Sequence, residues 1–321
     1  MAIFTAGALG VDFSQLDLAP LSAATPASPT PVSVTLSVGG VIMQLLGTGF
    51  EFSAAGPPTG GVIQRLIVTA DTGPAYEISG LSLSAATFRG WVLAGDNAAA
   101  KAGIFSGADS LAGSGAADRL NGYAGNDTVS GGAGGDLITD TSGSNYLRGD
   151  EGDDDIVGGV NFDDINGNMG NDTASGGAGD DWVVGGKDND RLFGDEGGDL
   201  VYGNLGDDYC EGGAGNDTIR GGQQNDSLSG GSGADFVSGD RGDDTMTGGA
   251  GADMFHSSSD AGVDRVLDFS ASEGDLVLLD PGTTYSISEV GGDTVITMNA
   301  GQVILLGVSS ATLAAGSIVV G

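Results

Sequence analysis

A nine-residue unit repeats through the middle of the chain and limits its possible folds more than any other feature. Written as G-G-x-G-x-D-x-U-x, with U apolar, the unit occurs 17 times in succession within residues 103–256, without insertions. The sixth position is aspartate in every unit except the one where Asn145 replaces it, and the eighth is always apolar. A fixed period of this kind indicates a repeat architecture in which each unit packs against its neighbours.

The sixth-position aspartates are the candidate metal ligands. A turn rich in glycine can point several carbonyl oxygens inward, and the aspartate at its end adds a carboxylate. Oxygen ligands of this type suit a hard cation of the size of Ca²⁺, although aspartate is also common in exposed turns. The candidates are Asp109, Asp118, Asp127, Asp136, Asp154, Asp163, Asp172, Asp181, Asp190, Asp199, Asp208, Asp217, Asp226, Asp235, Asp244 and Asp253.

The last three residues of each unit are long enough for a short strand, so two units form one 18-residue lap with two turns and two strands. Stacked laps about 4.8 Å apart place residues 18 positions apart above one another. The apolar residues of the two strand stacks then form a narrow core, whereas the aspartates form ladders of like charge that a cation must neutralise. The predicted fold is all-β, with a parallel β-roll at its centre.

Charge and composition exclude several functional classes. The formal net charge is -34, from 44 acidic and 10 basic residues, so binding to nucleic acid or to anionic lipid is not expected. No apolar run is long enough for a membrane-spanning helix. Cys210 is the only cysteine, so an intramolecular disulfide is impossible, and its eighth-position register predicts a buried core residue.

The repeat is flanked by two regions without the period. Residues 1–102 are predicted to form a β-rich interaction or assembly domain, with a Pro-rich arm at 20–32 and a short helix at 84–95. Its strands are expected at 32–38, 41–46, 49–54, 62–70 and 75–79. Residues 257–321 are predicted to form a β cap, with strands at 264–270, 275–279, 284–290, 293–298 and 302–308.

The unit resembles the nonapeptide of RTX (repeats-in-toxin) proteins. The segments GADMF (251–255) and DRVLDFSASEGDLVLLD (264–280) are similar to the C-terminal region of serralysin-type secreted proteases. The resemblance implies a β-roll that holds on the order of a dozen Ca²⁺ ions. It also implies an extracellular or cell-surface location, reached by type I secretion with an uncleaved C-terminal signal. Carbonyl ligands are expected from second- and fourth-position glycines, namely Gly132, Gly134, Gly177, Gly179, Gly213, Gly215, Gly231 and Gly233.

The residue inventory does not favour an enzyme. A zinc protease motif needs two histidines, and His256 is the only one; the G-x-S-x-G motif of serine hydrolases is absent from the sequence. We therefore expect a secreted calcium-binding structural protein that self-assembles into a homo-oligomer, a surface layer or a fibre. The alternative is an adhesin or matrix protein whose N-terminal domain binds a cell-surface glycan or another cell; a secreted hydrolase is less favoured.

Overall fold

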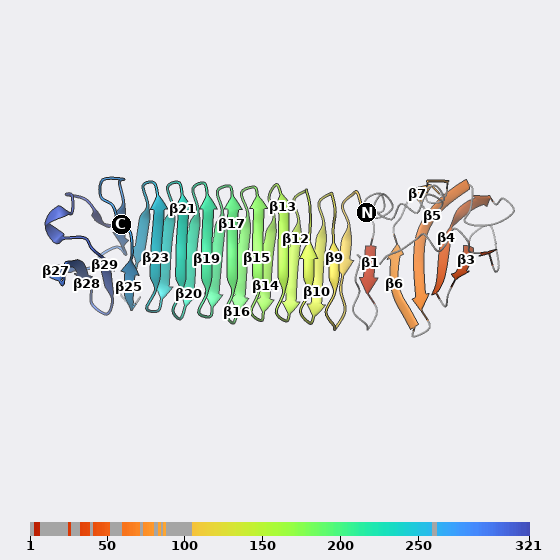
Figure 1. Ribbon diagram of the computed structural model, residues 1–321, viewed down its shortest axis with the longest axis horizontal. Coiled ribbons are helices and arrows are strands. Elements are labelled where there is room, and N and C mark those ends of the chain that lie inside the picture. Colours follow the sequence, from red (N-terminus) through yellow and green to blue (C-terminus); the bar gives the residue numbers. More distant parts are fainter. Residues whose placement is uncertain are drawn as a thin grey trace. The chain divides into compact units, whose positions relative to one another are not determined.

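A computed structural model shows that the chain is built of β-strands (Figure 1). It describes residues 3–6, 25–26, 33–38, 41–51, 60–70, 73–79, 83–84, 86–87, 105–258 and 262–321. Contacts divide the chain into two compact units, 1–147 and 148–321. Across the described ranges, no helix is long and apolar enough to cross a membrane. The all-β prediction is confirmed.

The second unit contains two stacks of parallel strands. The first stack consists of β13 (Asp155–Val160), β15 (Thr173–Ala178), β17 (Arg191–Glu196), β19 (Tyr209–Ala214), β21 (Ser227–Ser232), β23 (Thr245–Ala250), β25 (Val263–Val266) and β29 (Gln302–Leu305). The second consists of β14 (Asp164–Met169), β16 (Trp182–Lys187), β18 (Leu200–Leu205), β20 (Thr218–Gln223), β22 (Phe236–Arg241), β24 (Met254–Ser257), β26 (Leu276–Leu279) and β30 (Ile318–Val320).

The register of these stacks confirms the predicted 18-residue lap. Thr218 of β20 lies opposite Phe236 of β22, and Ile219 lies opposite Val237. Successive nine-residue repeats alternate between the two stacks because each short strand is followed by a glycine-rich turn. This arrangement is the parallel β-roll predicted from the sequence.

The eighth-position residues of the repeats form the core within each of the two compact units. From Leu111 to Phe255, each is at most 2 % exposed. Full burial of such a side chain stabilises the folded state by roughly 1.5–3 kcal/mol. Cys210 is fully buried with a free thiol, which confirms its predicted place in the core.

The first unit combines an antiparallel sheet with the first repeats. The sheet contains β1 (Ile3–Ala6), β2 (Thr25–Pro26), β3 (Ser33–Val38), β4 (Val41–Glu51), β5 (Gly60–Ala70), β6 (Gly73–Ser79) and β7 (Leu83–Ser84). The repeats contribute β8 (Ser110–Ala112), β9 (Arg119–Asn121), β10 (Thr128–Ala133) and β11 (Leu137–Thr139), and β12 (Tyr146–Glu151) carries residues of both units. The predicted strands at 41–46 and 49–54 are one strand, β4.

Strand β1 joins the two parts of the first unit. It pairs with β6 in the antiparallel sense and with β8 in the parallel sense, where Ile3 lies opposite Ser110. The first repeat strand therefore has a hydrogen-bonded neighbour that is not a repeat, and its edge is covered.

Parts of the N-terminal predictions lie outside the described residues. Of the Pro-rich arm at 20–32, only Thr25–Pro26 is described; it forms β2 and pairs with β3. Of the predicted helix at 84–95, Ser84 belongs to β7, residues 86 and 87 are helical, and the remainder lies outside the described residues. The boundary expected at residue 102 also falls outside them, within 88–104.

The tail continues the parallel stacks beyond the last nonapeptide. Its strands β25, β26, β27 (Ser286–Val290), β28 (Asp293–Thr297) and β29 lie at the five predicted places. Strands β25 and β26 extend the two stacks, and β27 and β28 form an antiparallel hairpin against β29.

Candidate metal centre

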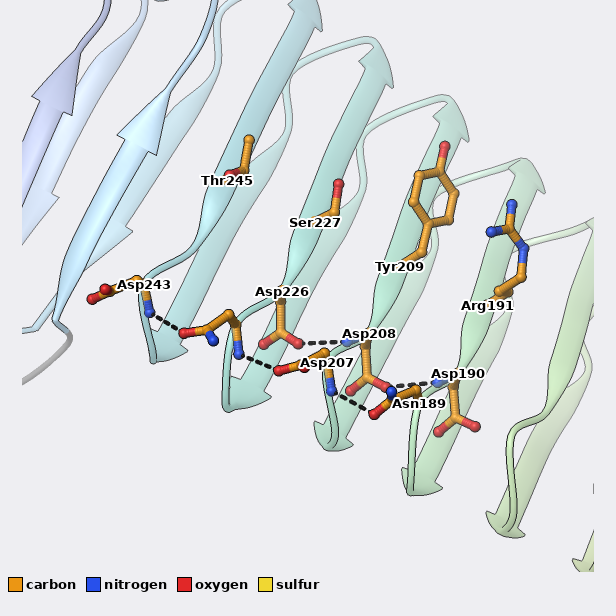
Figure 2. Close-up of a pocket in the computed structure, with 11 residues that line it drawn as sticks. Asn189, Asp190, Arg191, Asp207, Asp208, Tyr209, Asp226, Ser227, Asp243 and Thr245 are labelled. Atoms are coloured by element: carbon orange, nitrogen blue, oxygen red, sulfur yellow. Dashed lines mark hydrogen bonds between the residues drawn. The ribbon is translucent and has the colours of Figure 1, made fainter.

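The sixth-position aspartates turn inward at the edges of the roll and are buried. Each is at most 3 % exposed, and burial of this degree is unusual for a carboxylate. One carboxylate oxygen, Oδ1, accepts the backbone N–H of the aspartate one lap earlier. Asp199 N donates to Asp217 Oδ1 at 2.8 Å, and Asp217 N donates to Asp235 Oδ1 at 2.9 Å. The same bonds link Asp190, Asp208 and Asp226 on the opposite edge (Figure 2).

The other carboxylate oxygen, Oδ2, is buried and accepts no hydrogen bond from any described residue in much of the array. A buried, ionised oxygen without a partner is costly, so its recurrence indicates that these oxygens serve a ligand. The residues with such an Oδ2 are Asp127, Asp140, Asp172, Asp181, Asp190, Asp199, Asp208, Asp217, Asp226, Asp235 and Asp244.

The first-position glycines leave a space that these oxygens line. A Cβ atom added to Gly212 would lie 2.6 Å from Asp217 Oδ2 and 2.7 Å from the carbonyl oxygen of Gly230, which belongs to the next lap. Gly158 has the same surroundings, with Asp163 Oδ2 and the Gly176 oxygen both at 2.6 Å. Carboxylate and carbonyl oxygens from successive laps thus converge on one point, and this donor set fits Ca²⁺.

The glycines predicted to supply carbonyl ligands lie in the same turns as the aspartates, but they occupy the second and fourth positions of the repeat and not the first. Gly213 and Gly215 adopt φ angles of 111° and 137°, which favour glycine, so the second and fourth positions shape the turn. The carbonyl that faces the Asp217 carboxylate belongs instead to a first-position residue, Gly230. Ligation by Gly132, Gly134, Gly177, Gly179, Gly213, Gly215, Gly231 and Gly233 stays a prediction.

Burial and mutual repulsion raise the pKa of these carboxyl groups. The pKa of Asp190 and that of Asp226 are raised to about 8, first by burial and then by the charges of neighbouring aspartates. The same causes raise the pKa of Asp172 and of Asp199 to about 7. The metal-free turns therefore bind protons near neutral pH, and a cation can replace those protons.

The one unit that lacks the sixth-position aspartate carries a carboxylate elsewhere. Asn145 Oδ1 still accepts the N–H of Asp127 at 2.8 Å, so the hydrogen-bond ladder continues. Asp140 stands at the first position of this unit, and its Oδ2 reaches the space beside Gly122 that Asp127 Oδ2 also lines. The charge lost at position six is thus supplied from position one, which the sequence pattern did not indicate.

Two further aspartates continue the ladders after the nonapeptides end. Asp264 accepts the N–H of Asp244 at 3.4 Å, and Asp275 accepts that of Asp253 at 3.0 Å. They follow their partners by 20 and 22 residues, so a search at a period of nine misses them. The signal available in the sequence was an aspartate followed two residues later by an apolar residue, as in the repeats, at Asp264–Val266 and Asp275–Val277.

A second, exposed ladder runs beside the first at the fifth position. Asp207 N donates to Asn189 Oδ1 at 2.9 Å, and Asn225 N donates to Asp207 Oδ1 at 3.0 Å. This ladder borders a groove of about 550 Å³ that Asp208 and Asp226 also line (Figure 2). Asn and Asp recur at the fifth position in the sequence, although the repeat formula leaves that position unspecified.

The sequence comparison agrees with this geometry. The sequence model of the family "RTX calcium-binding nonapeptide repeat (4 copies)" matches residues 105–138, 130–165, 166–201, 185–219, 202–237, 220–255 and 229–263. The segment 105–263 is an array of RTX calcium-binding nonapeptide repeats. The RTX repeats bind Ca²⁺, and proteins that carry them are typically secreted.

Two solved structures resemble the chain at low overall similarity. The extracellular lipase LipA from Serratia marcescens is 18 % identical, with a TM-score of 0.27 over 67 % of this chain and 40 % of the lipase. The AlgE6R3 subunit of the Azotobacter vinelandii mannuronan C5-epimerase is 23 % identical, with a TM-score of 0.20 over 50 % of this chain and 78 % of that subunit. Among curated proteins, no sequence matches the chain.

Proposed function

We propose that this RTX protein is a secreted structural protein that folds on binding Ca²⁺ and self-assembles at the cell surface or in the extracellular matrix. The observation that carries the proposal is the series of buried Oδ2 atoms without hydrogen-bond partners, several of which lie beside a carbonyl oxygen of the next lap. These are the Oδ2 atoms of Asp181, Asp199, Asp208, Asp217 and Asp235. In each turn, a sixth-position carboxylate and backbone carbonyls would hold the ion.

The repeats would respond to calcium through their own charges. With little calcium, carboxylates such as Asp199, Asp217 and Asp235 repel one another across successive laps, and this repulsion favours the open chain. Bound Ca²⁺ supplies the positive charge that offsets them. Because the sites exist only in the folded state, calcium stabilises that state by mass action.

Circular dichroism tests the folding step. The full chain is expected to gain β-sheet signal as Ca²⁺ is added to chelated protein and to lose it when chelator is restored. Full β-sheet content after thorough chelation would contradict the proposal. The expected number of ions, on the order of a dozen, is measured by a calcium titration.

Export and assembly are further parts of the proposal. The similarity of residues 251–280 to serralysin-type tails supports type I secretion through a C-terminal signal. Residues 1–102, with few charges, would provide the contacts for assembly. Electron microscopy of the purified protein in millimolar Ca²⁺ is expected to show layers or fibres. Monomers at every concentration, combined with glycan binding by residues 1–102, would favour the adhesin or matrix alternative.

We infer no enzymatic role for this chain, because its ionisable groups are concentrated in the repeats. A hydrolase activity that depends on residues 1–102 would contradict this inference.

A further inference from the structure

A second groove in the unit 148–321 has a composition unlike that of the rest of the roll. It has a volume of about 470 Å³ and is lined by Tyr202, Asn204, Arg220, Gly222, Gln223, Asp240, Arg241, His256, Ser258 and Asp280. Two of the 10 basic residues of the chain and its only histidine are gathered here. The lining contains no sixth-position aspartate, so the groove is distinct from the calcium turns.

The side chains at one end of the groove are held by hydrogen bonds between successive laps. The Arg220 guanidinium donates to Tyr202 Oη at 3.1 Å. It also donates to both carboxylate oxygens of Asp240, at 2.9 Å and 2.6 Å. A bidentate pair of this kind fixes both side chains before any ligand arrives.

The other end is ordered by the histidine. His256 Nδ1 lies 3.0 Å from Ser238 Oγ, and His256 Nε2 lies 3.3 Å from Asp280 Oδ1. The imidazole also stacks on Phe236 with ring centroids 5.7 Å apart. One connected network therefore runs along the groove from Tyr202 to Asp280.

The serine, histidine and aspartate of this network do not form a hydrolase site. Ser238 is fully buried, and its Oγ donates to Asp240 Oδ1 at 2.9 Å, so it is not accessible to a substrate. Ser238 contacts Nδ1 of His256, and Asp280 contacts Nε2, which reverses the roles of the two nitrogens in a Ser-His-Asp triad. The arrangement is a rigid polar surface and not a nucleophile with its base.

The charges of the groove balance, in contrast to those of the rest of the chain. Arg220 and Arg241 offset Asp240 and Asp280, whereas the whole chain carries -34. An anionic ligand would meet the repulsion of the surrounding carboxylates, and a cation has stronger sites in the turns. The ligand that fits is uncharged and rich in groups that both donate and accept hydrogen bonds.

We propose that this groove binds a neutral saccharide unit. The planar amide groups of Asn204 and Gln223 suit pairs of adjacent hydroxyl groups, because each offers a donor and an acceptor in one plane. The volume lies within the range of small-molecule sites, roughly 300–1,000 Å³. The groove belongs to the roll itself, so this proposal is independent of any role of residues 1–102.

Substitutions that remove the amide side chains from the groove test the proposal with little risk to the fold. Asn204 occupies the second position of its unit with a φ of 80°, where glycine is the usual residue, so Asn204→Gly removes the side chain and relieves the backbone. Gln223→Ala shortens an exposed third-position residue. Asn168 is the matched control: it occupies the same unit position with a φ of 78° and does not line the groove.

Calorimetry of the full chain in saturating Ca²⁺ would use cellotetraose, maltotetraose, mannotetraose and chitotetraose, with tetragalacturonate as the charged comparison. At least one neutral sugar is expected to bind, with an affinity about tenfold weaker in the Asn204→Gly/Gln223→Ala double variant and unchanged in Asn168→Gly. Calcium-dependent circular dichroism should be the same in all three proteins.

Three results would overturn the proposal: no binding of any neutral sugar, equal binding by the double variant, or tighter binding of tetragalacturonate than of every neutral sugar. Each of these leaves the calcium-dependent folding of the repeats unaffected. The failure of this inference is therefore distinguishable from the failure of the proposed function.

Discussion

Asp199 donates its backbone N–H to Oδ1 of Asp217 at 2.8 Å, while Oδ2 of the same Asp217 carboxylate is buried without a hydrogen-bond partner. One side chain thus has two separable tasks. Its first oxygen connects the backbones of successive laps, and its second faces the space beside Gly212, where we place the cation.

The substitution Asp217→Asn separates these tasks. The amide oxygen can still accept the N–H of Asp199, but the charge is lost. We expect the calcium-free protein to gain about 1 kcal/mol of stability, because a buried repulsive charge is removed. The calcium-induced rise in melting temperature should be smaller than in the wild type.

Asn216→Asp is the control for Asp217→Asn, because it adds a charge at the exposed neighbouring position and keeps the acceptor for Ala234 N. We expect little change in calcium response from this variant. Equal and opposite effects of the two substitutions would mean that net charge, and not the site, controls the response.

The space beside Gly212 predicts a steric effect. In Gly212→Ala, the new Cβ would lie 2.6 Å from Asp217 Oδ2 and 2.7 Å from the Gly230 oxygen, so the turn must shift and calcium binding should weaken. Gly198→Ala is the control, since the nearest atom to its Cβ would be 3.4 Å away. Calcium titrations of both variants measure the difference. A similar calcium affinity in both would contradict the assigned site.

The carboxylate supplied by Asp140 predicts that a second substitution can compensate for its removal. Asp140→Gly should weaken calcium binding beside Gly122, because Asp127 would lose the neighbouring carboxylate there. The double variant Asp140→Gly/Asn145→Asp restores the consensus residues at the first and sixth positions and should recover the affinity. The number and affinity of bound ions, measured by calorimetry, check this prediction. No effect of Asp140→Gly alone would show that this residue does not contribute.

The raised pKa values predict opposite effects of pH with and without calcium. Between the ordinary carboxyl pKa of 3.8 and the folded-state pKa of about 8 for Asp190 and Asp226, the folded, calcium-free chain holds more protons than the unfolded chain. Its stability should therefore fall as pH rises through this window. Calcium competes with these protons, so calcium affinity should rise over the same window.

Circular dichroism in chelator at pH 5 and pH 8 measures the first trend as the β-sheet content of the calcium-free chain, and calcium titrations at the same two pH values measure the second. More β-sheet content at the higher pH in chelator would contradict the prediction, because it would mean that the buried carboxyl groups are not protonated in the folded state.

The fourth-position residue Gln224 holds a φ of 81°, a region that favours glycine. Gln224→Gly should stabilise the calcium-bound protein by about 1 kcal/mol, since relief of backbone strain exceeds the entropic cost of the added glycine. Thermal unfolding at fixed calcium concentration measures this change. A lower melting temperature would show that the side chain makes a compensating contact.

The sequence was sufficient to predict the roll, its register and the candidate carboxylates, because every lap repeats the same residue pattern and therefore the same turns and strands. Ile219 and Asp217 could be placed by counting alone. Counting could not place Asp264 and Asp275, whose turns differ in length, nor could it find Asp140, which supplies its charge from another position. The pairing of Ile3 with Ser110 is a contact between distant segments, for which local pattern carries no information.

The bonds between Asp199, Asp217 and Asp235 join each lap only to the laps directly before and after it. The array therefore behaves as a one-dimensional lattice, in which order spreads by nearest-neighbour coupling. The steepness of the calcium response depends on that coupling, and the length of the array sets how many neighbours respond together. A chain of this design can adjust the sharpness of its transition by gaining or losing whole laps, with no change in any single binding turn.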